Sequence, residues 1–339
     1  MSGTGSPSGS ASCIRSGTTP AWPPRPDPVA GGATAGSSVM TETSPHEFER
    51  HRGYLQGLAY RMLSSVAEAE DVVQDAYLRW HGSDREAVEN PRAFLSRIVT
   101  RLCLDRLKSA RSRRETYVGP WLPEPLIETG PAVDPHGDTV AEDVSVALML
   151  ALERLSPLER AAFILHDIFD MGFDEIAAAL NRSAATCRQL ASRARSHIET
   201  ERPRFNVDED EGARLSQAFF AASHSGDMAT LRDILAETAT LHGDGGGRKR
   251  STLRPVTGAD KIARFYAGLA RKADRTGPLW AAPCTINGLP GWATVEHDGT
   301  LQTTALEIAG GRIAAVYVTR NPDKLRHVAR MVPEGLLQP

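Results

Sequence analysis

The residues best suited to a chemical task lie on one predicted helix near the middle of the chain. Arginine can donate two hydrogen bonds to guanine, and glutamine can bond adenine in the same bidentate way. A helix that enters a DNA major groove presents such side chains along its outer face. The residues that this helix would offer to DNA are Ala184, Ala185, Arg188, Gln189, Ser192 and Arg193. We expect Arg188, Gln189, Ser192 and Arg193 to bind DNA.

Two short helices joined by a tight turn are predicted to position this surface, over Phe173–Arg195. Asn181 tolerates a left-handed turn conformation, and Ser183 can cap the second helix. The apolar stripes of the two helices are formed by Ile176, Ala177, Leu180, Cys187 and Leu190. The pattern is typical of a helix-turn-helix. A helical hairpin with a solvated cationic face would show the same local pattern, so the rest of the chain has to decide between the two.

A second cationic helix is predicted to begin at Asn90-Pro91, because proline suits the first helical position. From Arg92 to Arg114 the chain has eight basic residues against one acid, Asp105. Apolar residues occupy the opposite side of the helical wheel. A cationic stripe backed by a buried face favours contact with DNA phosphates. The candidate DNA-binding residues on this helix are Arg92, Arg97, Arg101, Lys108 and Arg111.

Composition excludes several classes of protein. The 339 residues carry a formal charge of −3, made of opposed blocks such as the acidic stretches at 68–75 and 208–211. Such blocks suit a chain that binds nucleic acid with one part and protein with another. The four cysteines lie far apart, so we expect neither a disulfide framework nor a metal site. No apolar run approaches the ~20 residues that span a membrane. The sequence predicts a cytoplasmic protein without a cofactor.

Changes in residue pattern divide the chain into segments. Residues 1–45 are rich in Ser, Gly and Pro and are expected to be disordered, and translation is expected to start at Met40. The predicted segments after this extension are a helical domain at 46–115, a Pro- and Gly-rich linker at 116–140, a helical domain at 141–200 that ends in the helix-turn-helix, an α+β domain at 208–328, and a tail at 329–339. Within the second helical domain, Ser156, Pro157 and Glu159 predict the beginning of a helix.

The C-terminal domain is predicted to place helices before a curved antiparallel sheet. The expected strands are separated by turns at Asn287-Gly288, Asp298-Gly299 and Gly310-Gly311, and their ranges are 238–242, 279–286, 292–296, 301–308 and 312–319. The expected helices cover about 212–223, 227–236 and 259–272. The Gly-rich stretch Asp244–Gly247 lacks the ending of a phosphate-binding loop. We interpret it as a structural turn that docks against another domain.

Three stretches, in order, resemble those of bacterial extracytoplasmic-function sigma factors. Residues 67–80 (AEAEDVVQDAYLRW) resemble the helix that docks on the β′ clamp helices of RNA polymerase. Residues 90–108 (NPRAFLSRIVTRLCLDRLK) resemble the promoter-melting helix. The helix-turn-helix resembles region four, which reads the upstream "minus thirty-five" element. The resemblance implies two all-α sigma domains, called regions two and four, that bind promoter DNA.

The resemblance also implies partners. Core RNA polymerase would be bound through its β′ clamp helices and its β flap. The residues expected to form the clamp contact are Asp71, Gln74, Asp75 and Leu78. A solvated helix face is the alternative interpretation of these four residues. Bases of the opened DNA strand would be held near the loop between Gly82 and Asn90. The free protein is expected to be a monomer.

Three further motifs resemble a subgroup of these sigma factors that is fused to a SnoaL-like domain, a cone-shaped α+β fold. They are Tyr117–Pro125 (YVGPWLPEP), Asp244–Arg248 (DGGGR) and Asn321–Leu325 (NPDKL). In that subgroup the extension regulates the sigma factor in cis. The expected regulatory residues are Asp244, Gly245, Gly246, Gly247, Arg248, Asn321, Pro322, Asp323, Lys324 and Leu325. Arg248 replaces the usual lysine, which keeps the charge and changes its geometry.

An alternative function is a cyclase- or isomerase-type enzyme that a helical module tethers to DNA. His242, Asp244 and His297 are the candidates for acid–base chemistry in such a domain. The sequence does not bring them together, so we expect no catalytic residues. A small-molecule ligand inside the cone is a separate possibility.

Overall fold

The computed structural model of the protein describes residues 43–84, 87–115, 117–128, 145–199, 208–273 and 277–337. The predicted N-terminal extension, the proposed start at Met40 and residues 129–140 of the predicted linker lie outside the described residues. So do the side chains of Ser109–Glu115, which end the third helix.

The first helical domain has three helices, α1 (Thr43–Leu63), α2 (Val66–His81) and α3 (Pro91–Glu115). Ser65 caps α2 by accepting a hydrogen bond from the backbone N–H of Glu68. The predicted proline is the first residue of α3, and the Asn90 side chain accepts from the N–H of Ala93 at 3.1 Å. The sequence therefore sets where both helices begin.

The second helical domain has α4 (Val146–Glu153), α5 (Pro157–Phe163), a π-helical turn η2 (Ile164–Ile168), α6 (Phe173–Leu180) and α7 (Ala184–Glu199). The predicted capping box of Ser156 and Glu159 begins α5. Between α6 and α7, Asn181 has a left-handed conformation with φ 53°. The Ser183 hydroxyl accepts from the N–H of Thr186 at 3.2 Å. These contacts confirm the predicted helix-turn-helix geometry.

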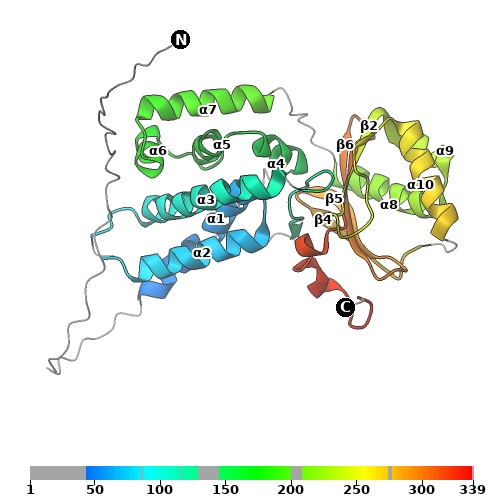
Figure 1. The fold of residues 1–339 in the computed structure, drawn as a ribbon, viewed down its shortest axis with the longest axis horizontal. Coiled ribbons are helices and arrows are strands. Elements are labelled where there is room, and N and C mark those ends of the chain that lie inside the picture. Colours follow the sequence, from blue (N-terminus) through cyan, green and yellow to red (C-terminus); the bar gives the residue numbers. More distant parts are fainter. Residues whose placement is uncertain are drawn as a thin grey trace, which may run out of the picture. The chain divides into compact units, whose positions relative to one another are not determined.

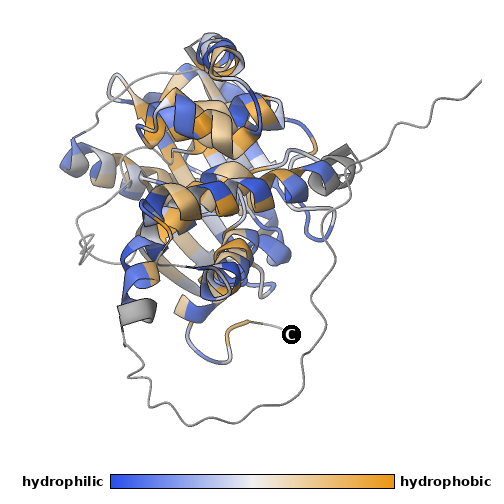
Figure 2. Cartoon of the chain, turned by 90° about the vertical axis from the view of Figure 1, so that its left-hand side faces the viewer, coloured by the Kyte–Doolittle hydropathy of each residue, from blue (hydrophilic) through white to orange (hydrophobic). Residues whose placement is uncertain are grey.

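One continuous hydrophobic core joins the two helical domains. Helix α3 lies against α1 and α2 and also packs on α5 and α6 (Figure 1). Its buried side chains include Leu95, Val99 and Cys103. The helices carry both hydrophobic and hydrophilic residues along their length, as Figure 2 shows, and the hydrophobic ones form this core. The predicted promoter-melting helix therefore contacts the helix-turn-helix directly.

The C-terminal domain combines three helices with a sheet. Its helices are α8 (Glu209–Ser225), α9 (Met228–Ile234) and α10 (Ala259–Ala273), and its strands are β2 (Leu235–Asp244), β3 (Val256–Thr257), β4 (Trp280–Ile286), β5 (Leu289–Val295), β6 (Leu301–Ala309) and β7 (Arg312–Thr319). Helices α8–α10 pack against the sheet around Phe219, Leu241 and Ile262. This arrangement confirms the predicted α+β class. Two 3₁₀ turns, η3 (Pro322–Lys324) and η4 (Val328–Met331), follow the last strand.

The sheet departs from the predicted antiparallel pattern in one strand pairing and in two short additional strands, β1 (Ile127–Glu128) and β3. Its order is β1-β4-β5-β6-β7-β2-β3, and β2 pairs with β7 in parallel. A parallel pair needs a long crossover connection, and the chain from β2 to β7 supplies it. Strand β1 comes from the predicted linker and pairs with β4. Within the described residues, no helix is long and apolar enough to cross a membrane.

Candidate DNA-binding surface and the contacts that hold it

Helix α7 presents the predicted recognition residues to solvent. All four predicted residues are exposed: Arg188, Gln189, Ser192 and Arg193. The inner side of the helix is buried at Cys187, Ala191 and Ala194. The Arg188 guanidinium lies 5.2 Å from the ring of Phe173, on α6. A cation over an aromatic face is attracted to it, so Phe173 steadies the first of the four residues.

The cationic residues of α3 divide into two groups. Arg92 and Lys108 are exposed, and Arg97 is half-buried with its guanidinium 5.2 Å from the ring of Phe94. Arg101 instead donates hydrogen bonds to the carbonyl oxygens of Ala178 (3.0 Å) and Ala179 (3.3 Å). These carbonyls end α6, where the helix dipole attracts a cation. The side chain of Arg111 lies outside the described residues.

The predicted polymerase-binding residues share the outer side of α2. Gln74 is exposed, and the Leu78 side chain is 63 % exposed, which is unusual for a large apolar residue. Asp71 and Asp75 form ion pairs with Arg106 of α3, at 3.5 and 3.1 Å. The surface therefore combines one apolar side chain with two partly neutralised carboxylates.

A buried polar cluster joins the two helical domains. Arg160, on α5, is 2 % exposed and donates to the Glu153 carboxylate at 2.7 Å. It also donates to the Ser64 hydroxyl at 2.6 Å and to the Arg61 carbonyl at 2.9 Å, both at the end of α1. Burial lowers the pKa of the Arg160 guanidinium. We call Ser64, Glu153 and Arg160 the Arg160 cluster.

The predicted linker contacts both the first helical domain and the C-terminal domain. The Glu124 carboxylate accepts from the backbone N–H groups of Val66 (2.8 Å) and Ala67 (3.3 Å), at the beginning of α2. Tyr60 donates to the Glu124 carbonyl at 2.7 Å, and the Asn287 side chain donates to the Tyr60 hydroxyl at 2.7 Å. A carboxylate at a helix N-terminus stabilises the helix dipole. These bonds fix α2 to the linker, and they fix α1 to the linker and to the turn after β4.

A second buried cluster fixes the linker to the end of the C-terminal sheet. Asp244 is 0 % exposed, and its two oxygens accept four hydrogen bonds. The donors are the Tyr117 hydroxyl (2.5 Å), the Leu122 N–H (2.9 Å), the Gly246 N–H (3.0 Å) and the Lys324 ammonium (2.7 Å). Burial and the bond to Asp244 raise the pKa of the Tyr117 hydroxyl, which therefore stays protonated and donates. We call Tyr117, Leu122, Asp244, Asn321 and Lys324 the Asp244 cluster.

The predicted regulatory motifs meet in this cluster. Asn321 donates to the Tyr117 hydroxyl at 2.8 Å, and the Lys324 ammonium lies 3.9 Å from the ring of Trp121. Gly246 has φ +58°, and a Cβ atom there would collide with the Asn321 side chain. Glycine is therefore required for this close approach. Arg248 forms an exposed ion pair with Asp323 at 3.3 Å.

The structure separates the three candidate acid–base residues. Leu241 and Gly243 of β2 line a cavity, and side chains alternate along a strand. His242 and Asp244 therefore lie on the opposite face of the sheet, where His242 stacks on Tyr317 at 5.4 Å. His297 lines the cavity and is exposed.

His242 is expected to make stability depend on pH. Burial, and then the charge of Arg154, lower the pKa of His242. The unfolded chain, with a histidine pKa of about 6.5, binds the proton more readily. The stability that the neutral ring contributes is therefore present above about pH 6.5 and is lost as pH falls below it. Thermal unfolding between pH 7 and 5 should depend less on pH in His242→Gln, whereas exposed His297→Gln should unfold like the wild type. Equal pH dependence in His242→Gln and the wild type would contradict this assignment.

Sequence reasoning missed the Arg160 cluster and the contacts of Glu124. An arginine directly before the apolar run Ala161–Leu165 is the local sign that its charge needs a buried partner. Nothing local identifies that partner, since Arg61 and Ser64 lie 99 and 96 residues away.

Comparison with known proteins defines the class of this chain. The Sigma-70 region 2 family matches residues 48–113, and the Sigma-70 region 4 family matches residues 145–198. The first range covers most of α1–α3, and the second covers α4–α7 up to the last residue of α7. The chain belongs to the extracytoplasmic-function (ECF) RNA polymerase sigma factors, which direct transcription.

Two relatives extend the match through the C-terminal domain. The chain is 39 % identical to the ECF sigma factor SigJ of Mycobacterium tuberculosis, over 82 % of this chain and 92 % of SigJ. It is 32 % identical to the probable ECF sigma factor SigI of the same species, over 81 % and 92 %. The crystal structure of SigJ superposes with a TM-score of 0.67 and 36 % identity, covering 83 % of this chain and 98 % of that structure. Its match is consistent with a SnoaL-like C-terminal domain.

Proposed function

We propose that α7 reads the upstream promoter element while α3 binds the DNA backbone. The α7 residues that would contact bases or neighbouring DNA phosphates are Arg188, Gln189, Ser192 and Arg193. The α3 residues that would contact phosphates are Arg92, Arg97 and Lys108. The exposure of the four α7 residues, on a helix whose beginning is capped by Ser183, supports this assignment. Phosphate contacts supply affinity and base contacts supply selectivity.

For the polymerase, we propose that the outer side of α2 binds the β′ clamp helices and that the second helical domain binds the β flap. Exposed Leu78 would supply the apolar centre of the clamp contact, flanked by Asp71, Gln74 and Asp75. Apolar residues at the centre of an interface and charges around it are the usual arrangement. The protein would act in the cytoplasm as a monomer without catalytic activity of its own.

The C-terminal domain is proposed to regulate this activity in cis. The bonds of Arg101 to α6 carry the proposal, because they hold α3 against the first helix of the helix-turn-helix. A residue that binds α6 does not neutralise a phosphate in the same arrangement. The Asp244 cluster and Glu124 fix the linker that would have to move for the two domains to separate. Polymerase would select the separated state, a shift between two populations.

Gel shifts with Arg188→Ala and Arg97→Ala test the division of roles on DNA. Loss of a base contact is expected to reduce discrimination by roughly 1–3 kcal/mol, so Arg188→Ala should weaken binding to a target promoter more than to unrelated DNA. Arg97→Ala should weaken binding to every sequence alike and flatten its salt dependence. The reverse pattern would show that readout is assigned to the wrong helix. Specific transcripts from the protein, core polymerase and a promoter template provide the reference activity.

A further inference from the structure

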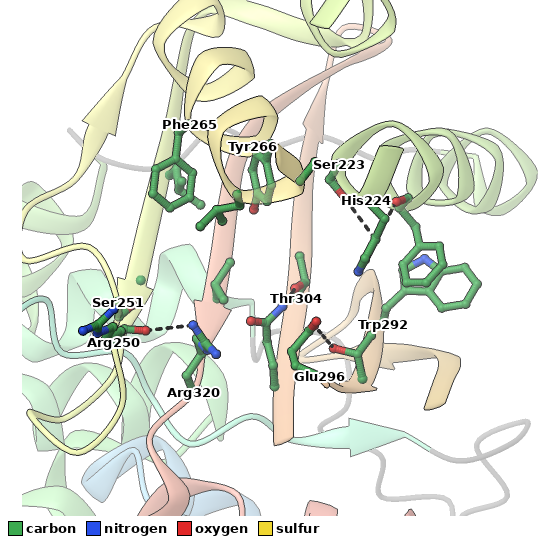
Figure 3. A pocket seen from close by; sticks show the side chains of 18 of the residues that line it. Ser223, His224, Arg250, Ser251, Phe265, Tyr266, Trp292, Glu296, Thr304 and Arg320 are labelled. Atoms are coloured by element: carbon green, nitrogen blue, oxygen red, sulfur yellow. Dashed lines mark hydrogen bonds between the residues drawn. The ribbon is translucent and has the colours of Figure 1, made fainter. Parts of the chain in front are cut away.

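A cavity of about 470 Å³ lies between the sheet and the helices of the C-terminal domain. Figure 3 shows Phe265 and Tyr266 of α10 on one side, and Ser223 and His224 of α8 on another. Trp292 of β5 and Thr304 of β6 come from the sheet. Pockets that bind small molecules in proteins commonly have volumes of about 300–1,000 Å³. The cavity is therefore large enough for a molecule of several rings.

Flat aromatic side chains line one part of the cavity. Phe220 stacks on Trp292, with ring centroids 4.1 Å apart and planes 18° from parallel. The His224 ring lies 4.4 Å from Phe220, and its Nδ1 is bonded to the Phe220 carbonyl. Leu241 and Val318 continue the apolar lining. Such a wall favours a planar apolar molecule, because offset stacking adds to the burial of its surface.

Polar side chains that could form further hydrogen bonds line another part of the cavity. The Glu296 carboxylate accepts one hydrogen bond, from the Thr294 hydroxyl at 3.1 Å, and has no ion pair among the described residues. An ionised carboxylate can accept about four. Burial, and after it the charge of Glu296, raise the pKa of Tyr266. The Tyr266 hydroxyl makes no hydrogen bond in the described part of the chain. By contrast, Arg320 donates to the Arg250 carbonyl at 2.9 Å and faces Asp298 at 3.8 Å.

We propose that this cavity binds a planar, mostly apolar molecule of two or three rings whose hydroxyl group donates a hydrogen bond to Glu296. A hydroxyl fits Glu296 better than a carboxylate does, because two like charges would repel each other there. The hydroxyl of Tyr266, which lines the same cavity, provides a second polar contact.

Calorimetric titration of the full chain with 2-naphthol tests the proposal. This probe has two fused rings and one hydroxyl, and we expect saturable binding to one site per chain. Gln302→Trp should fill the cavity from β6 and weaken binding at least tenfold. Gln217→Trp makes the same change on the exposed side of α8, outside the cavity, and should bind like the wild type. Absence of saturable binding, or binding that survives Gln302→Trp, would overturn the proposal.

The polar end has its own test. Glu296→Gln keeps the shape of the side chain and removes the charge, so binding of 2-naphthol should weaken about five- to tenfold. Glu237→Gln, on the exposed side of β2, serves as the matched control. The anion 2-naphthoate should bind the wild type more weakly than 2-naphthol does. Tighter binding of 2-naphthoate, or unchanged affinity in Glu296→Gln, would show that the hydroxyl does not lie at Glu296. These measurements need neither polymerase nor promoter, so they stand apart from the proposed regulation.

Discussion

Replacing Asp244 with alanine is expected to free the linker and to destabilise the folded protein by about 3–5 kcal/mol, the usual cost of removing one partner of a buried ion pair. The carboxylate accepts four hydrogen bonds and is completely buried. Its loss leaves the Lys324 ammonium, only 8 % exposed, without its carboxylate. Tyr117 and the Leu122 N–H lose an acceptor at the same time.

Hydrogen exchange measures the release of the linker segment at 117–128. If all of the free energy lost in Asp244→Ala had stabilised the bound linker, hydrogen exchange of the linker amides should accelerate roughly hundredfold or more. Asp260→Ala is the control, because Asp260 binds Arg232 and Arg264 on the surface of the same domain. That variant should leave exchange at 117–128 unchanged. Unaltered exchange in Asp244→Ala would show that the cluster does not anchor the linker.

The same variant tests regulation in cis. Freeing the linker removes one restraint on the separation of the two helical domains, so the separated state should become more populated. We therefore expect Asp244→Ala to bind core polymerase more tightly than the wild type does. Equal affinity, together with accelerated exchange, would mean that the linker moves without controlling the sigma domains.

The helix-turn-helix could be predicted from the sequence because its determinants are local. Asn181 needs only its own backbone preference for a left-handed turn, and Ser183 caps a helix that begins one residue later. The same holds for Pro91 at the beginning of α3 and for the capping box of Ser156 and Glu159. Each of these contacts spans three residues or fewer, so a short stretch of sequence contains all of it.

The contacts that join the domains could not be predicted in this way. Asp244 and Tyr117 are 127 residues apart, and Arg101 and Ala179 are 78 apart. Their residue types allow many partners, and only packing of the whole chain selects one. The glycine-rich loop shows the limit. It was predicted to dock against another domain, whereas Gly246 lies against Asn321 of its own domain and Gly247 against Val118 of the linker. Strand β1 was missed because two residues carry no detectable alternation.

Arg160→Met is expected to weaken the connection between the two helical domains more than any single surface change. It removes the hydrogen bonds to the Arg61 carbonyl and the Ser64 hydroxyl and the ion pair with Glu153. Removing one partner of a buried ion pair costs about 3–5 kcal/mol, so denaturant unfolding should show a loss of this size. Arg195→Met removes an exposed ion pair with Asp167, within the second helical domain, and should cost about 0–1 kcal/mol.

The double variant Arg160→Met, Glu153→Leu separates stability from domain coupling. Apolar replacement of both partners of a buried pair is often neutral for stability, so most of the lost free energy of unfolding should return. The hydrogen bonds from residue 160 to Arg61 and Ser64 would stay absent in the double variant. The distribution of distances between spin labels on α2 and α7 should therefore be broader than in the wild type in both the single and the double variant. A double variant that restores the narrow distance distribution would show that hydrophobic packing alone holds the domains together. Recovery of stability with a broad distribution would assign the coupling to Arg160 itself, since its bonds to Arg61 and Ser64 are the contacts that the second substitution cannot replace.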